Sequence, residues 1–220
     1  MSYQFEKKTL ILMSKSKKNR CYCVAGFDVE NQEWCRLISC NKTTDYAIDP
    51  IDFRDKEGNE PELLSEITVD CVKVEKDPIQ TENYLLNSSE PIIINHDREN
   101  SWQKLKESPK LFRNPGPFIY GNTCRYLIAS EIDQFDYSLI FVKVDDFSVY
   151  RDIKYKCCFN YNGRHYKDIS YTCHGLPKIG ETFPMALILV SIPHTECCGK
   201  YYKFVSSCIL NEDGMTKIFS

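Results

Sequence analysis

Residues 9–39 constrain the fold more than any other part of this chain, because three short apolar runs follow one another there between polar clusters. The runs cover residues 9–13, 21–28 and 34–39. Runs of this length bounded by polar residues are typical of β-strands. The clusters between them, residues 14–20 and 29–33, are predicted to be a loop and a turn. Three consecutive strands joined in this way predict a meander at the start of a small β-barrel.

The first of the two connections is basic. A basic loop between early strands of a small barrel is well suited to hold phosphates, because cations there can follow a nucleic-acid backbone. We therefore predict that its four cations contact phosphates: Lys15, Lys17, Lys18 and Arg20. Trp34 and Arg36 follow on the third run and are predicted to stack or clamp beside them.

The 220 residues are enough for one large domain or for two domains of about 100 residues each. A polar break at residues 131–136 places the boundary of a two-domain chain there, which gives domains 1–132 and 133–220. The formal net charge of -3 argues against a protein that coats nucleic acid with its whole surface. Charge is uneven, however, because every charged residue between positions 7 and 20 is a cation, while acids dominate residues 45–77. This pattern fits a local basic face as well as a set of solvated faces.

No apolar run is long enough for a signal peptide or a membrane span, and the longest covers only residues 185–190. We therefore expect a cytoplasmic chain without a membrane partner. Its twelve cysteines are then expected to be reduced thiols.

The remaining pattern is mostly β, or β-rich α+β, with one notable helix in the first half. Residues 67–74 alternate and are rich in β-branched side chains, which predicts a strand. Residues 97–107 are the best helix candidate, with Asn95 or Asp97 as its N-cap. Further strands are expected at residues 124–129, 137–149, 185–192 and 201–210.

A hairpin is predicted in the second half. Residues 153–161 and 164–171 flank Asn162-Gly163, the dipeptide that a type I′ turn prefers because both central residues need positive φ. Alternation then places Tyr161, Arg164 and Tyr166 on one face with other aromatic residues. Such a face either stacks bases as a second binding surface or fills the core of a barrel, and burial decides between the two.

Several short motifs resemble those of the dual-OB-domain family, a little-characterised prokaryotic group. The opening pattern of that family resembles Ser14-Lys15-Ser16-Lys17, Arg20-Cys21, Ala25-Gly26-Phe27-Asp28 and Trp34-Cys35-Arg36. A Gln-x-Glu-Asn element resembles Gln80 to Asn83, and the late motifs resemble Tyr161 to Tyr166 and Tyr202-Lys203-Phe204-Val205. The chain departs from the family pattern in its extra cysteines and its long acidic loop.

This resemblance implies two OB-like small β-barrels and a nucleic-acid or nucleotide role, often near defence or nucleic-acid-modification genes. It implies no catalytic residue. An OB barrel binds oligonucleotides on one sheet face and with its connecting loops. Lys203 accordingly joins the predicted nucleic-acid contacts.

Catalytic and metal chemistry finds little support in the sequence. A zinc site would have to use residues from two loops, because adjacent cysteines on a strand point to opposite faces. Its best set is Cys173, His174, His194, Cys197 and Cys198. No Gly-rich phosphate loop and no local signature of a nucleophile are present, so we predict no cofactor and no enzyme activity.

The leading hypothesis is a non-enzymatic module that binds single-stranded DNA or RNA. A second hypothesis is a sensor of a small nucleotide or modified base, with Gln80, Glu82 and Asn83 reading base edges. A third is an adaptor that recruits an effector protein through the acidic loop.

Overall fold

The computed structural model describes residues 4–74, 79–173, 175, 177–212 and 215–219, with no description of side chains after residue 210. The chain forms two compact units. Unit 1 comprises Met1–Asp77 and Thr81–Leu111, and unit 2 comprises Pro78–Gln80 and Phe112–Ser220. The boundary expected between residues 132 and 133 falls within unit 2. The reason is that the segment before it supplies core side chains to this unit, namely Ile119, Tyr120, Leu127 and Ile132.

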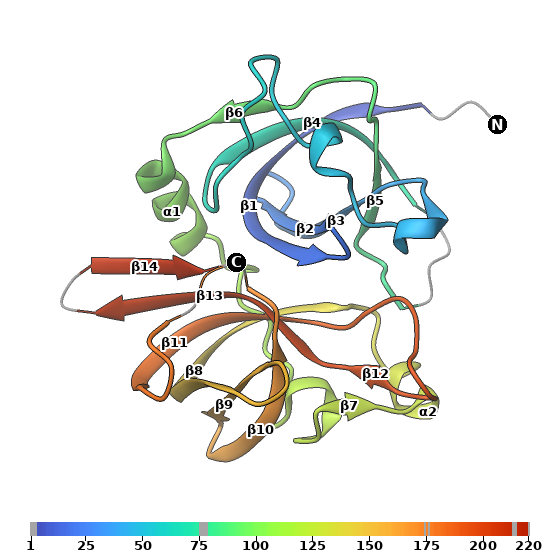
Figure 1. Cartoon of the computed structure of the whole chain (residues 1–220). Coiled ribbons are helices and arrows are strands. Elements are labelled where there is room, and N and C mark those ends of the chain that lie inside the picture. Colours follow the sequence, from blue (N-terminus) through green and yellow to red (C-terminus); the bar gives the residue numbers. More distant parts are fainter. Residues whose placement is uncertain (1–3, 75–78, 174, 176, 213–214, 220) are drawn as a thin grey trace. The chain divides into compact units, whose positions relative to one another are not determined.

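Unit 1 contains a closed five-stranded barrel. Its strands are β1 (Glu6–Lys18), β2 (Cys21–Asp28), β3 (Glu33–Ile38), β4 (Glu66–Lys73) and β5 (Asn83–Leu86). They are hydrogen-bonded in the order β1-β2-β3-β5-β4, and β4 pairs with β1 to close the ring (Figure 1). The β3–β5 ladder is parallel and the other ladders are antiparallel.

Unit 2 repeats this topology. Its strands are β8 (Leu139–Arg151), β9 (Tyr155–Tyr161), β10 (Arg164–Tyr171), β11 (Thr182–Ser191) and β13 (Phe204–Glu212). They lie in the order β8-β9-β10-β13-β11, and β11 pairs with β8. As in unit 1, the third and fifth strands, β10 and β13, form the parallel ladder. The order 1-2-3-5-4 in both units is that of an OB barrel, so the mostly β prediction of two OB-like barrels is confirmed.

Short elements complete each unit. In unit 1 these are η1 (Lys42–Thr44), η2 (Pro50–Asp52), β6 (Ile93–Asn95) and α1 (Arg98–Lys106). In unit 2 they are η3 (Ile119–Gly121), β7 (Tyr126–Leu127), α2 (Ala129–Ile132), β12 (Tyr201–Tyr202) and β14 (Met215–Phe219).

The helix expected in the first half is α1. The Asp97 carboxylate caps it by accepting the backbone N–H of Asn100. Among the described helices, none has the length and apolar character needed to cross a bilayer.

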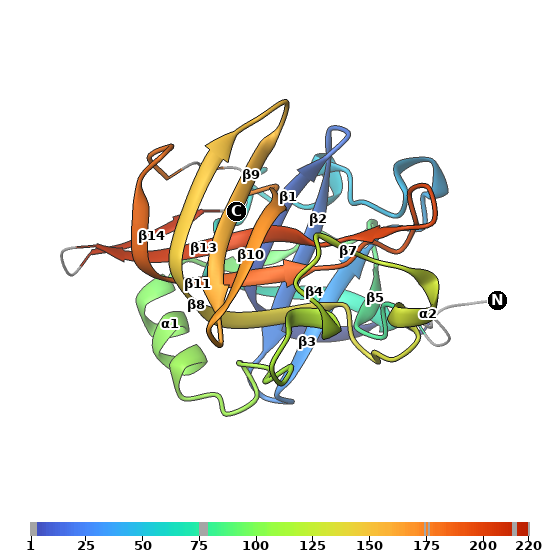
Figure 2. The same cartoon turned by 90° about the horizontal axis from the view of Figure 1, so that it is seen from below.

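The basic connection predicted as a loop at residues 14–20 is a hairpin instead. Strand β1 continues to Lys18, and only Asn19 and Arg20 form the turn (Figure 2). Both have positive φ, 50° and 71°, which is the type I′ geometry that matches the twist of the flanking strands. The polar residues 14–18 therefore belong to a strand, because pairing with β2 satisfies their backbone groups.

Gly26 lies where β1 and β2 approach closely. A Cβ atom there would lie 3.0 Å from the carbonyl oxygen of Ile11 and 3.0 Å from Cβ of Leu10. The backbone of β1 leaves no room for a side chain at this point. The glycine of the Ala25-Gly26-Phe27-Asp28 motif is thus explained by packing.

We predict that Gly26→Ala destabilises unit 1 by about 1–3 kcal/mol, the usual cost of overpacking a core. Gly26→Val should cost more, because a branched side chain increases the same clash. Urea unfolding of the full chain measures both. A Gly26→Ala variant at least as stable as the wild type would contradict this account, since alanine also lowers the entropy of the unfolded chain.

Candidate nucleic-acid interface

The turn of the β1–β2 hairpin exposes two cations. Lys17, on β1, and Arg20, in the turn, are both exposed. Neither forms an ion pair with any side chain that the structure describes. Both are therefore available to a phosphate.

Lys15 and Lys18 differ, because each contacts a carboxylate. Lys15 Nζ lies 3.3 Å from Glu60 and donates a 2.8 Å hydrogen bond to the carbonyl oxygen of Pro61. Lys18 pairs with Asp45. Both acids belong to the acidic connection between β3 and β4. This connection therefore neutralises two of the four predicted phosphate contacts.

Glu60 is held firmly as a carboxylate. It accepts hydrogen bonds from the Tyr22 hydroxyl at 2.8 Å and from the Arg54 guanidinium at 3.1 Å, besides its contact with Lys15. Partial burial raises the pKa of Glu60, but these three partners outweigh it and lower the pKa below its usual value. Glu60 therefore stays charged at neutral pH.

Trp34 and Arg36 are buried in unit 1, at 3% and 9% exposure. The indole of Trp34 packs edge-on against Phe27, with ring centroids 5.4 Å apart, and donates to the carbonyl oxygen of Leu111 at 3.2 Å. Trp34 and Arg36 lie two residues apart and therefore share one face of β3, where the segment around Leu111 covers Trp34. The sequence predicted that these two side chains stack on a base or clamp it. Their burial leaves neither of them placed to do so.

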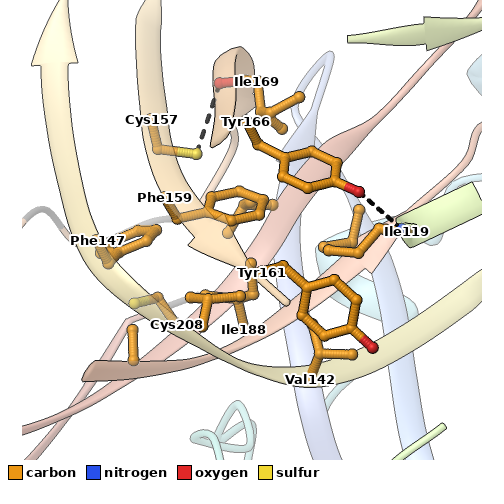
Figure 3. Close-up of a cluster of buried hydrophobic side chains, with 14 of the residues drawn as sticks. Ile119, Val142, Phe147, Cys157, Phe159, Tyr161, Tyr166, Ile169, Ile188 and Cys208 are labelled. Carbon is orange, nitrogen blue, oxygen red and sulfur yellow. Dashed lines mark hydrogen bonds between the residues drawn. The ribbon is translucent and has the colours of Figure 1, made fainter. Parts of the chain in front are cut away.

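The aromatic face of the β9–β10 hairpin is barrel core. The turn at Asn162-Gly163 and the register pairing Tyr161 with Arg164 are as predicted. Tyr166, however, is 0% exposed and Tyr161 only 8%. Figure 3 shows both rings in the cluster with Phe147 and Phe159. Burial thus decides for the core-filling alternative. Of the three residues predicted here, only Arg164 is exposed, and it lies 4.3 Å from the ring centroid of Phe118.

Tyr166 also has a polar partner. Its hydroxyl accepts the backbone N–H of Ile119 at 2.9 Å (Figure 3). A buried tyrosine usually needs such a partner. Tyr166 therefore fixes η3 against β10.

Lys203 is also internal, at 1% exposure. Its ammonium donates to the carbonyl oxygens of Ile119 and Asn122, both at 2.7 Å, and to Oδ1 of Asn122 at 2.9 Å. All three protons are used, so the side chain anchors η3 to the chain between β12 and β13 and cannot also contact a phosphate. Burial lowers the pKa of Lys203 to about 7.

The residues of the nucleotide-sensor hypothesis are buried as well. Gln80, Glu82 and Asn83 are each under 5% exposed, and the Gln80 amide donates to the carbonyl oxygen of Ile192 at 2.9 Å. A pocket in unit 1, lined by Ser39, Asn41 and Asp49 among others, holds about 80 Å³. Small-molecule sites usually hold about 300 Å³ or more. This pocket is too small for a nucleotide.

The residues of the alternative zinc set do not gather in the described parts of the chain. Cys173 is buried, Cys197 and Cys198 are exposed, and His194 is half-buried. Position 174 lies outside the described residues. Among the rest, no group of three or more metal-ligating side chains is placed to hold an ion.

Comparison with known proteins agrees with the topology. A family model described as a dual OB-containing domain matches residues 8–208. The chain belongs to this family. The resemblance seen in the sequence is thereby confirmed, and the matched residues span both OB barrels.

Two solved structures resemble the chain weakly. One, titled "Structural mimicry for functional antagonism", has a TM-score of 0.36 at 11% identity and covers 97% of this chain and 91% of its own. The other, a crystal structure of the Ifi202 HINa domain in complex with 20bp dsDNA, has a TM-score of 0.34 at 12% identity, with 97% and 94% covered. A search of curated proteins found no match.

One surface of unit 2 escaped prediction from the sequence. Exposed or half-buried cations and tyrosines gather where β7 pairs with β12, namely Arg125, Tyr126, Lys200 and Tyr202. We call this set the tyrosine patch. Each of these strands has only two residues, so no alternation pattern marked them. The one signal was the recurrence of tyrosine beside cations in both segments.

We predict that the stability of unit 2 rises with pH above about 7 because of Lys203. The pKa of this lysine is about 7 in the folded chain against an ordinary 10.5, so the unfolded chain binds more protons between these values. The gain is up to about 1.4 kcal/mol per pH unit. Urea unfolding of the wild type and of Lys203→Met between about pH 7 and 9 measures this gain. The difference between their free energies of unfolding should grow with pH.

Tyr166→Phe is the control, because it removes the hydrogen bond from Ile119 without removing the lysine. Its stability should differ from that of the wild type by a constant amount over this range. A constant difference for Lys203→Met as well would contradict the lowered pKa.

Proposed function

We propose that this dual-OB chain is a non-enzymatic module that binds nucleic acid, with single-stranded DNA or RNA favoured. The exposed cations of the β1–β2 hairpin carry the proposal. Lys17 and Arg20 lie at the end of a two-stranded ribbon on an OB barrel, unpaired among the described side chains. Loops and hairpins of OB barrels are where oligonucleotides are held.

The acidic connection between β3 and β4 competes with phosphates for two of the hairpin cations. A phosphate that approaches Lys15 or Lys18 has to compete with Glu60 or Asp45. Lys17 and Arg20 have no such competitor and should provide the first contacts. Each phosphate contact releases condensed counterions, so binding should weaken as salt increases.

We predict that Lys17→Gln combined with Arg20→Asn weakens binding and flattens its salt dependence. Asparagine is chosen because residue 20 has a φ of 71°, which asparagine tolerates. For two lost contacts to a single strand, the slope of log K against log salt should decrease by roughly 1.4. Fluorescence anisotropy with labelled single-stranded DNA, single-stranded RNA and duplex DNA at several salt concentrations measures this.

Lys106→Gln with Lys110→Gln is the charge-matched control, since both lysines are exposed in or just after α1. It should leave affinity nearly unchanged. If the hairpin variant binds as the wild type does, with the same slope, the hairpin is not the site. If the wild type binds none of the three nucleic acids at low salt, the proposed function fails.

The pairing also predicts a gain of affinity. Glu60→Gln and Asp45→Asn remove the competing charges and free Lys15 and Lys18. Exposed or half-exposed ion pairs contribute up to about 1 kcal/mol, so each variant should bind single strands roughly two- to fivefold more tightly. Unchanged affinity in both would show that Lys15 and Lys18 do not contact phosphate.

A place in bacterial defence or nucleic-acid modification, and an effector protein as a partner, remain parts of this proposal. The first follows from the family resemblance, and the second rests on the acidic loop as a surface for a partner. A co-purification of the chain from its native host tests the effector partner directly.

A further inference from the structure

The tyrosine patch begins with a short ladder outside the barrel strands. Tyr202 pairs directly with Tyr126, and Tyr201 with Leu127. Leu127 is fully buried, and Tyr201 packs against the core of unit 2. Side chains of directly paired residues lie on the same face of a ladder, and neighbouring residues alternate. Tyr126 and Tyr202 therefore lie on the face turned away from the core.

The two rings remain half-buried and lie close together. Their centroids are 5.8 Å apart with an interplanar angle of 61°. Lys200 Nζ lies 4.4 Å from the ring centroid of Tyr126, and the Arg125 guanidinium lies 5.9 Å from that of Tyr202. Aromatic rings and cations thus alternate over a small area of the surface (Figure 1 shows β7 and β12).

The cations of the patch lack acidic partners. Across the described parts of the chain, no carboxylate forms an ion pair with Arg125 or Lys200. Lys15 and Lys18 of unit 1 show the opposite arrangement, since each contacts a carboxylate. A phosphate on the patch would therefore replace water and counterions rather than a protein carboxylate.

Positive charge continues onto the barrel. Lys156 of β9 donates to Oγ of Ser170 at 2.9 Å, and Ser170 is in register with Phe204 of β13. Burial lowers the pKa of Lys156, and the nearby Arg125 guanidinium lowers it further, while Asp168 acts against them. Asp168 itself accepts the hydroxyl of Tyr150. Lys156 therefore lies near enough to Arg125 for the two charges to interact, with Asp168 and Asp152 also nearby.

We propose that the tyrosine patch is a binding surface for single-stranded nucleic acid, with bases stacked on Tyr126 or Tyr202 and phosphates on Arg125, Lys200 and Lys156. Stacking on aromatic rings beside cations is how single strands are held without sequence readout. A duplex keeps its bases stacked inside and offers these rings no base face. The proposal deepens the proposed function and rests on it, but it uses residues of the other unit.

The first test removes the rings without changing charge. Tyr126→Leu with Tyr202→Leu should weaken binding to a labelled oligothymidylate roughly tenfold or more, since one stacked base contributes about that much. Its salt slope should stay that of the wild type. The wild type should bind oligothymidylate better than an abasic strand of equal length, and the variant should bind both equally.

The second test removes the charges and keeps the rings. Arg125→Gln with Lys200→Gln should lower the salt slope for single strands, while Lys143→Gln with Lys167→Gln, two exposed lysines of the same unit, should not. Circular dichroism melts confirm that each variant folds. This pair of variants also keeps the proposal testable if the double leucine variant does not fold.

The outcomes separate the two proposals. If the hairpin variant loses affinity while the tyrosine and Arg125/Lys200 variants bind as the wild type does, the patch proposal is overturned and the proposed function stands. Loss in the patch variants supports the patch. Failure of the wild type to bind any strand overturns both. If the patch variants lose only binding to a protein partner, the patch proposal alone is overturned.

Discussion

Closure of each barrel depends on one long strand that takes part in two ladders. In unit 1, β1 pairs with β4 through its first half and with β2 through its second, and the register shifts between Leu12 and Ser14 where one ladder gives way to the other. In unit 2, β8 pairs with both β11 and β9. A bulge at such a point bends the strand and increases its twist. The bend turns a flat meander into a ring, and the parallel third-to-fifth ladder then completes it.

A closed ring needs an interior filled to native density. This requirement explains why so many side chains that could bind ligand are packed inside. Tyr166 stacks on Phe159 in the core of unit 2, with ring centroids 5.1 Å apart. Polar side chains are drawn in only where partners satisfy them. Lys8, for example, contacts both Asp28 and Glu33 at 2.7 Å, and Lys203 uses all three of its protons.

Local signals in the sequence predicted local structure well. The Asn162-Gly163 turn, the helix capped by Asp97 and the alternating strand around Val69 are all present. The Asn19-Arg20 turn was missed, because arginine carries no preference for positive φ. Burial was harder to predict, because an alternating aromatic strand looks the same whether its face meets solvent or a core. The tyrosine patch depends on two segments about 75 residues apart in the chain, and no local pattern links them.

The exposed cations of the two units therefore differ in the groups that surround them, and the amino-acid composition does not reveal this difference. On the hairpin of unit 1, half of the cations are paired with acids of the same unit, so binding there exchanges one anion for another. On the tyrosine patch, the cations lie against aromatic rings, which attract them without neutralising their charge. A net charge of -3 is thus compatible with two positive surfaces. Because salt screens exposed charge but affects stacking little, the hairpin should dominate binding at low salt and the patch should retain a larger share as salt increases.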